Sequence, residues 1–199
     1  MPDVIGWLLA NWIEALGFAT GIASVWLFAR QHVLAWPVGI VTSLCWFVLF
    51  VTSGLYADSG LQVFYVAVSL YGWWHWTRGR SSTSEGLPVT RTPRQLALVL
   101  IGAGLAATLG LGAFLDRATD STVPLPDAAT TVLSLVAYFL LARKHIETWP
   151  IWIFGVNVPY VALYLSKGLV LTAALQPLFI LLSVRGWLSW RRDLRETAG

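Results

Sequence analysis

The sequence predicts an all-α membrane protein with seven transmembrane helices, arranged as three, one and three. Three observations lead to this fold class: an apolar composition, a succession of apolar stretches of membrane-crossing length, and a long internal repeat. Of the 199 residues, 57% are hydrophobic and 12% are charged, and the mean hydropathy is +0.68. Soluble domains carry about 25% charged residues, so we expect residues 1–199 to form a single transmembrane domain.

Seven apolar stretches close to the ~20 residues that cross a bilayer follow one another along the chain. We expect these spans at residues 12–29, 36–52, 58–76, 95–115, 127–142, 149–165 and 169–190. The longest polar segment, 77–94, is rich in Arg, Ser, Thr and Gly and is predicted to be a loop. The opening "MPDVIGWLLANW" has no basic region before its apolar residues, so we expect it to be retained.

Basic residues gather on one side of the predicted membrane. Alternate loops hold ten of the thirteen Lys and Arg residues: Arg30, Arg78, Arg80, Arg91, Arg94, Arg143, Lys144, Arg191, Arg192 and Arg195. The opposite side receives Arg117 and Lys167, and Arg185 lies within the last span. Because the basic side is normally cytoplasmic, the N-terminus is predicted outside and the C-terminus in the cytoplasm. Topology thus explains the pI of about 9.3 without a nucleic-acid partner.

The last three predicted spans repeat the first three. At an offset of 113, "ARQHVLAWP" (29–37) pairs with "ARKHIETWP" (142–150), and one extra residue, assigned to Lys167, changes the offset to 114. Sixteen of 48 paired positions are identical. The pairs that chance rarely produces are Arg30/Arg143, His32/His145, Trp36/Trp149, Pro37/Pro150, Gln62/Gln176, Gly72/Gly186 and Trp73/Trp187. Residues 12–76 and 127–190 are therefore predicted to be two parallel three-helix repeats, joined by a linker helix at 95–115.

A parallel repeat favours a transporter over an enzyme or a scaffold, because such carriers bind substrate between two like halves near mid-membrane. The chain has no Gly-x-Ser-x-Gly elbow, no His-Glu-x-x-His motif and no paired buried carboxylates, so we predict no catalytic residues and no cofactor. Its single cysteine, Cys45, excludes an internal disulfide and a cysteine-based metal cluster. A scaffold would give no reason for the paired glutamines.

Three amide side chains are the polar candidates for substrate binding. Asn157 falls near the middle of span 149–165, Gln176 lies about 10 Å into the last span, and Gln62 is its repeat partner. Polar groups in hydrocarbon are costly without a partner, so each marks either helix packing or a site. Interhelical hydrogen bonding, worth about 0.6–2 kcal/mol per contact, is the alternative that stays open.

Aromatic residues accompany these amides. The stretch "WPIWIFGVNVPYVALYL" places Asn157, Tyr160 and Tyr164 on one helical face with Trp152 approximately in line, and Trp46 also falls deep in its span. This composition favours a ligand with a flat ring and polar substituents, neutral or cationic because no deep basic cluster could hold a phosphate. An interfacial aromatic belt is the preferred interpretation for the tryptophans at the cytoplasmic span ends, Trp73, Trp74, Trp76, Trp187 and Trp190.

Prolines and small residues predict where helices bend or pack. Pro159 and Pro177 should kink the last two spans, and their repeat positions hold Trp46 and Val63, so we expect an asymmetric site. No chain of buried charged residues suggests a proton relay, which favours passive carriage. Gly17 and Gly21 predict close helix packing, and a small-residue face on the linker span could meet another subunit. Its members are Gly102, Ala106 and Gly110.

These residues resemble a known family. The stretches "NWIEALGFATG", "VWLFARQHVLAWPVGIV" and "SGLYADSGLQVFYVAVSLYGWWHW" are similar to the first half of the PnuC family of bacterial vitamin transporters. "WPIWIFGVNVPYVALYLSKGLVLTAALQ" is similar to the family's second half. The linker span and the loop before it match in position only.

The resemblance implies an enlarged bundle of the SWEET sugar-carrier type in the bacterial inner membrane, usually a homotrimer surrounded by membrane lipid. It also implies facilitated diffusion of nicotinamide riboside for NAD biosynthesis, with trapping by a cytoplasmic kinase. The amides of Gln62, Asn157 and Gln176 would then bind ribose and carboxamide. Aromatic residues would pack on the ring, namely Trp46, Trp152 and Tyr160, with Tyr164 on the same face. Related carriers take thiamine or riboflavin, so another vitamin is the alternative substrate.

Overall fold

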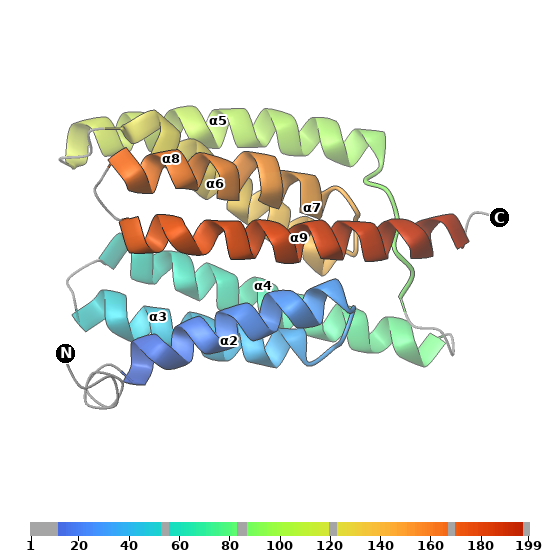
Figure 1. Cartoon of the computed structure of the whole chain (residues 1–199). Coiled ribbons are helices and arrows are strands. Elements are labelled where there is room, and N and C mark those ends of the chain that lie inside the picture. The colour runs from blue at the N-terminus through green and yellow to red at the C-terminus, as the bar shows by residue number, and fades with distance from the viewer. Residues whose placement is uncertain (1–11, 53–55, 83–86, 120–122, 167–169, 197–199) are drawn as a thin grey trace. The chain divides into compact units, whose positions relative to one another are not determined.

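The computed structural model describes residues 12–52, 56–82, 87–119, 123–166 and 170–196, and helices dominate these ranges (Figure 1). The helices are α2 (Trp12–Ala29), α3 (Ala35–Thr52), α4 (Tyr56–Ser82), α5 (Arg94–Ala118), α6 (Pro124–Ala142), α7 (Thr148–Pro150), the π-helix η1 (Ile151–Asn157), α8 (Val158–Ser166) and α9 (Val170–Glu196). Because α7, η1 and α8 follow one another without a break, they form one composite helix and the described chain has seven helical segments. The predicted all-α fold is confirmed.

The observed helices begin within three residues of the predicted spans, and α4 and α9 extend six residues further at their C-terminal ends. Among the described residues, α2, α3, α5 and α6 are each long and apolar enough to cross a membrane. The composite helix is interrupted by η1, while α4 and α9 carry Gln, Tyr, Trp and Arg side chains that lower their mean hydropathy.

The chain divides into two compact units, Met1–Leu87 and Pro88–Gly199. In the first unit α3 packs against both α2 and α4, and we call these three helices the first module. In the second unit the composite helix packs against both α6 and α9, and these form the second module. The linker helix α5 belongs to the second unit and packs along α6.

The two modules bury corresponding residues. Among the described side chains, every buried residue of α4 has a buried counterpart 114 positions later in α9. The six pairs are Ser59/Ala173, Gln62/Gln176, Val68/Leu182, Ser69/Ser183, Gly72/Gly186 and Trp76/Trp190. All four buried residues of α2 likewise have buried counterparts 113 positions later in α6. Each module therefore turns the same helix faces inward.

A tryptophan fills the same space in each module. The indole of Trp36 packs edge-on against Trp76 with ring centroids 5.3 Å apart, and Trp149 packs against Trp190 at 5.4 Å. Opposite each indole is a glycine: a Cβ built on Gly72 would lie 2.5 Å from Cζ2 of Trp36, and one on Gly186 would lie 2.5 Å from Cζ2 of Trp149. The prediction of an interfacial belt is therefore wrong for Trp76 and Trp190, which are fully buried, whereas Trp73 and Trp74 are exposed.

The first helix of each module ends in the same turn. Gln31 and Lys144 have positive φ angles of 56° and 57°. In the first turn the His32 N–H donates to Leu27 O at 2.9 Å and the Gln31 N–H donates to Phe28 O at 3.0 Å. The second turn has the equivalent bonds at the same lengths, from His145 to Leu140 and from Lys144 to Leu141. This is the Schellman pattern, which satisfies carbonyls at a helix end.

The second of these turns is covered by a chain segment. Thr90 forms a parallel bridge beside His145, donating its N–H to Lys144 O and accepting from the Ile146 N–H, both at 3.0 Å. Thr92 then donates its N–H and its hydroxyl to Oε2 of Glu147, at 2.9 and 2.7 Å. The predicted loop 77–94 thus ends in an extended segment that is fastened to the second module.

Glycines set the spacing of neighbouring helices. Gly17 faces Cys45 and Trp46, and Gly21 faces Thr42, so the predicted Gly-x-x-x-Gly contact joins α2 to α3. On α5, Gly104 and Gly112 face α6. Its other small-residue face is exposed, and a Cβ on Gly102 or Gly110 would meet nothing within 4 Å.

Candidate functional site

The two candidate glutamines occupy the same position in their modules. Gln62 lies on α4 and Gln176 on α9, and both side chains are more than nine-tenths buried. Each precedes a buried serine by seven residues, and this spacing of two helical turns places the pair on one face. The Ser69 hydroxyl donates to Tyr65 O at 2.7 Å, so that serine is satisfied within its own helix.

The amides of the candidate residues have no such partner. Within the described part of the chain, the side chains of Gln62, Asn157 and Gln176 make no hydrogen bond to protein. None of their amide atoms is among the fully buried, unpaired side-chain atoms of the described residues, so each amide keeps some access to solvent. The lack of a protein partner argues against these amides serving as hydrogen bonds between helices. Amides without a protein partner are suited to binding the polar part of a ligand.

Asn157 is presented by an irregular helix. It is the last residue of η1, and the next N–H, that of Val158, donates to Ile153 O five residues back. Pro159 follows at once and supplies no N–H of its own. Single-turn π-helices are frequent at functional sites because they change the direction of side chains within a helix. The sequence predicted a proline kink here, but not the π-helix.

The aromatic candidates lie in the same helices as the polar ones or beside them. In the first module Trp46 is half-buried on α3, packing edge-on against Phe18 at 5.2 Å and stacking with Phe50 at 5.8 Å. In the second module Trp152 and Tyr160 are half-buried on the composite helix. The Tyr164 side chain lies outside the described residues.

The candidate residues are divided between the two compact units of the chain. Gln62 and Trp46 belong to the first module. The second module contains Asn157, Trp152, Tyr160 and Gln176. All of these side chains are uncharged, which suits a ligand without a phosphate.

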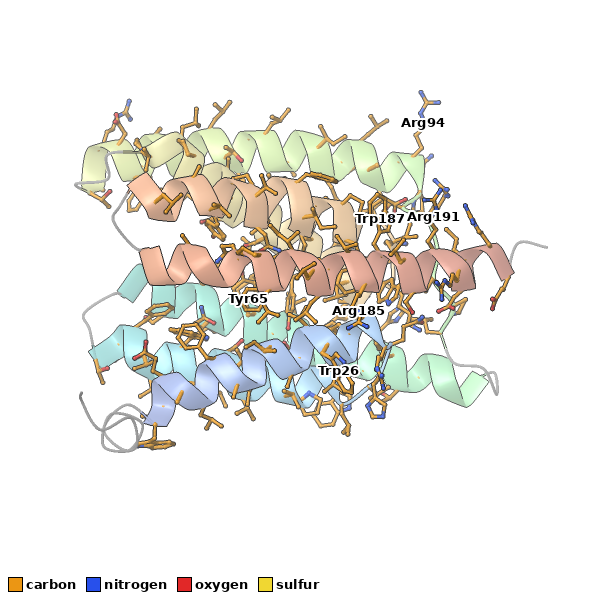
Figure 2. The ribbon with its side chains drawn as sticks, in the orientation of Figure 1. Trp26, Tyr65, Arg94, Arg185, Trp187 and Arg191 are labelled. Carbon is orange, nitrogen blue, oxygen red and sulfur yellow. The ribbon has the colours of Figure 1, made fainter. Side chains whose placement is uncertain are left out.

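Arginines are concentrated elsewhere on the second unit. A shallow pocket at the C-terminal end of α9 is lined by Leu188, Arg191, Arg192 and Arg195, and Figure 2 shows Arg191 toward that end of the helix. Twelve residues of helix separate Leu188 from Gln176, a rise of about 18 Å. The exposed Arg185 lies between them. The basic end of α9 is therefore distinct from the candidate amide site.

Ser43 is one of several buried polar residues that were not candidates from the sequence. Ser43 on α3 is 6% exposed, and among the described residues its hydroxyl makes no hydrogen bond. Its neighbour Thr42 bonds to Val38 O at 3.0 Å, which is how hydroxyl groups in helices are usually satisfied. Only the burial pattern of the folded helix separates these two adjacent residues.

The chain is similar to known transporters over nearly all of its length. Residues 11–192 match the family model described as nicotinamide mononucleotide transporter. The nicotinamide riboside transporter PnuC of Escherichia coli K12 is 25% identical, over 94% of this chain and 87% of the relative. The riboflavin/roseoflavin transporter RibM of Streptomyces davaonensis is 29% identical, over 94% of this chain and 88% of the relative.

The fold also matches a solved structure. The crystal structure of the vitamin B3 transporter PnuC aligns with a TM-score of 0.74 at 22% sequence identity. The alignment covers 97% of this chain and 86% of that one. The arrangement of helices is therefore that of a known transporter fold.

Proposed function

The chain belongs to the nicotinamide mononucleotide transporter family of multi-pass membrane proteins, and we propose that it carries nicotinamide riboside into the cell by facilitated diffusion. The family is one of vitamin transporters, and we propose the substrate and the mechanism of this member. Phosphorylation by a cytoplasmic kinase would trap the substrate and feed NAD biosynthesis.

One observation carries the assignment of the binding residues. Gln62 and Gln176 are buried at equivalent positions of the two modules, and neither has a protein hydrogen-bonding partner among the described residues. In a transporter family, paired unsatisfied amides suit the hydroxyl and amide groups of a substrate. Asn157 would add a third amide, while Trp46, Trp152, Tyr160 and Tyr164 would supply ring faces for the cationic pyridinium.

The uncharged site favours the nucleoside over the nucleotide. Nicotinamide mononucleotide carries a phosphate, and the candidate residues include no Lys or Arg to neutralise it. Riboflavin is the second candidate substrate, because RibM is similar to this chain over as much of its length as PnuC is. Riboflavin and thiamine also combine flat rings with polar groups.

Repeat structure supports the proposed mechanism. Corresponding helices, buried faces and turns support the proposal that α2–α4 and α6–α9 are two copies in a three, one and three arrangement of seven transmembrane helices. Two like halves suit alternating access. Candidate residues without charge give no group for coupling to protons, which favours uniport. We also propose that the N-terminus lies outside the inner membrane and the C-terminus in the cytoplasm, because the loops on one predicted side carry most of the basic residues.

The test of substrate is a calorimetric binding panel on the purified protein. Nicotinamide riboside, nicotinamide mononucleotide, riboflavin and thiamine would be titrated separately. We expect nicotinamide riboside to bind at least about tenfold more tightly than the other three, a difference of about 1.4 kcal/mol. Tighter binding of riboflavin would assign this chain to the flavin carriers, and binding of none would reject the proposed vitamins.

The test of the binding residues uses matched amide-to-leucine variants. We expect Asn157→Leu, Gln62→Leu and Gln176→Leu to weaken substrate binding by about ten- to a hundredfold each, because each removes hydrogen bonds to a desolvated ligand. The control is Gln95→Leu, the same change at an exposed position on α5. Unaltered affinity in Asn157→Leu, with normal thermal stability, would assign that side chain to packing.

A further inference from the structure

The middle helices of the two modules begin at equivalent positions. Their first residues, Ala35 and Thr148, are 113 positions apart, whereas the buried residues of α4 and α9 correspond at 114 positions. The second module therefore takes up one extra residue between Thr148 and Ala173, either inside the composite helix or at Lys167, the place that the sequence repeat favours.

The burial pattern locates the extra residue more closely. Trp36 and Trp149, at the offset of 113, are both buried. Beyond η1 only the offset of 114 preserves the pattern, because Leu44 and Val158 are 51% and 47% exposed, whereas Leu44 and Asn157, at the offset of 113, are 51% and 6% exposed. The change of register thus falls within η1, the one described segment in which the helix takes up an additional residue per turn.

In this register Asn157 has an equivalent residue in the first module. At the offset of 114, Asn157 corresponds to Ser43, and both side chains are 6% exposed. Tyr160 then corresponds to Trp46, and both rings are half-buried. The first module therefore carries the same sequence of groups as the second: a small polar side chain followed three residues later by an aromatic ring.

We propose that Ser43 is a substrate-binding residue of the first module, equivalent to Asn157, and that η1 keeps the two in register. This inference rests on the proposed function, because it assigns a further group to the same site. Ser43 would give its hydroxyl to a polar substituent of the ring-bearing vitamin. Its hydroxyl has no protein partner among the described residues, as the amide of Asn157 has none.

Ser43→Ala tests the hydroxyl directly. The variant should bind nicotinamide riboside about three- to tenfold more weakly, the effect of one lost hydrogen bond, with an unchanged melting temperature. The control is Ser24→Ala, a serine buried to 7% exposure in α2 whose hydroxyl bonds to Gly21 O at 2.8 Å. Equal affinities in Ser43→Ala, Ser24→Ala and the parent protein would overturn the assignment.

Two single-residue deletions test the register. Deleting Phe154, an exposed residue of η1, should convert the π-helix into α-helix and leave the following residues in place. Deleting Val41, an exposed residue of the regular α3, should rotate Ser43 and Trp46 by about 100°. We expect a melting temperature and substrate affinity close to the parent's for the first deletion, and a loss of both for the second.

The outcomes distinguish a failure of this inference from a failure of the proposed function. If both deletions destabilise the protein equally, η1 does not keep the modules in register and the inference fails. If the parent protein binds none of the vitamins in the panel, the proposed function fails, while the melting temperatures of the deletions still decide the register. Normal substrate binding by the parent and by Ser43→Ala would remove Ser43 alone from the site.

Discussion

At the scale of single residues, the tryptophan and glycine pairs carry the packing of each module. A methyl group on Gly72 would overlap the Trp36 indole, and the indole is enclosed by Trp76 and Phe28, whose ring centroids lie 5.3 and 4.6 Å away. Because a fully buried ring cannot move aside without moving its neighbours, this contact tolerates no side chain.

Gly72→Ala should therefore destabilise the protein by about 1–3 kcal/mol, the usual effect of overpacking a core. Gly60→Ala is the control in the same helix, because a Cβ there meets nothing within 4 Å. That control should be neutral or slightly stabilising, since alanine favours helix over glycine by up to about 1 kcal/mol. Thermal unfolding in detergent compares the two, and equal melting temperatures would contradict the packing.

Residue identity predicted these pairs but not their role. Trp36 and Trp149 stood out because tryptophan rarely matches by chance, as did Gly72 and Gly186. Their contact with each other follows only from the packing of the middle and last helices. Trp76 and Trp190 were assigned to the membrane interface because a terminal position in a span does not reveal which way a side chain points.

At the scale of elements, the segment before α5 is fastened to the turn between α6 and α7. Oε2 of Glu147 accepts two hydrogen bonds from Thr92, and Thr90 pairs with the backbone beside His145. The corresponding position in the first module is Leu34, which is 55% exposed. This segment makes α5 and the second module one unit of the chain.

Glu147→Ala should lower stability by about 1–3 kcal/mol, because it leaves the N–H and hydroxyl of Thr92 without their acceptor. Leu34→Ala, at the equivalent exposed position, is the matched control and should change stability by less than about 0.5 kcal/mol. Unfolding monitored by circular dichroism separates the two variants. An unchanged midpoint in Glu147→Ala would mean that water replaces the carboxylate at no cost.

Helix bounds were predictable from the sequence, but the π-helix was not. One extra apolar residue within an apolar stretch leaves no pattern that marks its position. Its position therefore has to be inferred from how the two repeats are paired. The matches Ile40/Ile153, Val48/Val161 and Ser53/Ser166 favoured an insertion after Ser166, yet such matches arise easily in an apolar chain. Burial decides the register because it shows which face of the helix each residue occupies. Ser43 became a candidate only after burial had paired it with Asn157.

At the scale of the whole molecule, we propose that the exposed face of α5 forms the contact between subunits of the homotrimer that the family resemblance implies. Gly102, Ala106 and Gly110 are exposed and do not pack on α6, in contrast to Gly104 and Gly112. Small residues four apart allow close approach of helices in membranes. Ala106→Trp should therefore dissociate the oligomer, whereas Leu105→Trp, at an exposed position about 100° round the helix from Ala106, should not. Light scattering of detergent-solubilised protein measures the mass, and an unchanged oligomer in Ala106→Trp would exclude this face.

The proposed orientation can be measured in intact cells. A cysteine introduced at Thr83 should react with membrane-permeant maleimides only, because the loop after α4 is predicted to be cytoplasmic. A cysteine at Thr119, after α5, should also react with an impermeant reagent. The opposite pattern would invert the predicted topology. Cys45 is buried and would be replaced by alanine in both backgrounds.

Uptake of labelled nicotinamide riboside into proteoliposomes tests the central claim most directly. With no ion gradient, we expect saturable uptake that ends at equal concentrations inside and outside, that is unaffected by a proton gradient, and that is lost in Asn157→Leu. Absence of uptake by a folded, oligomeric preparation, or accumulation driven by an ion gradient, would contradict passive carriage of this vitamin.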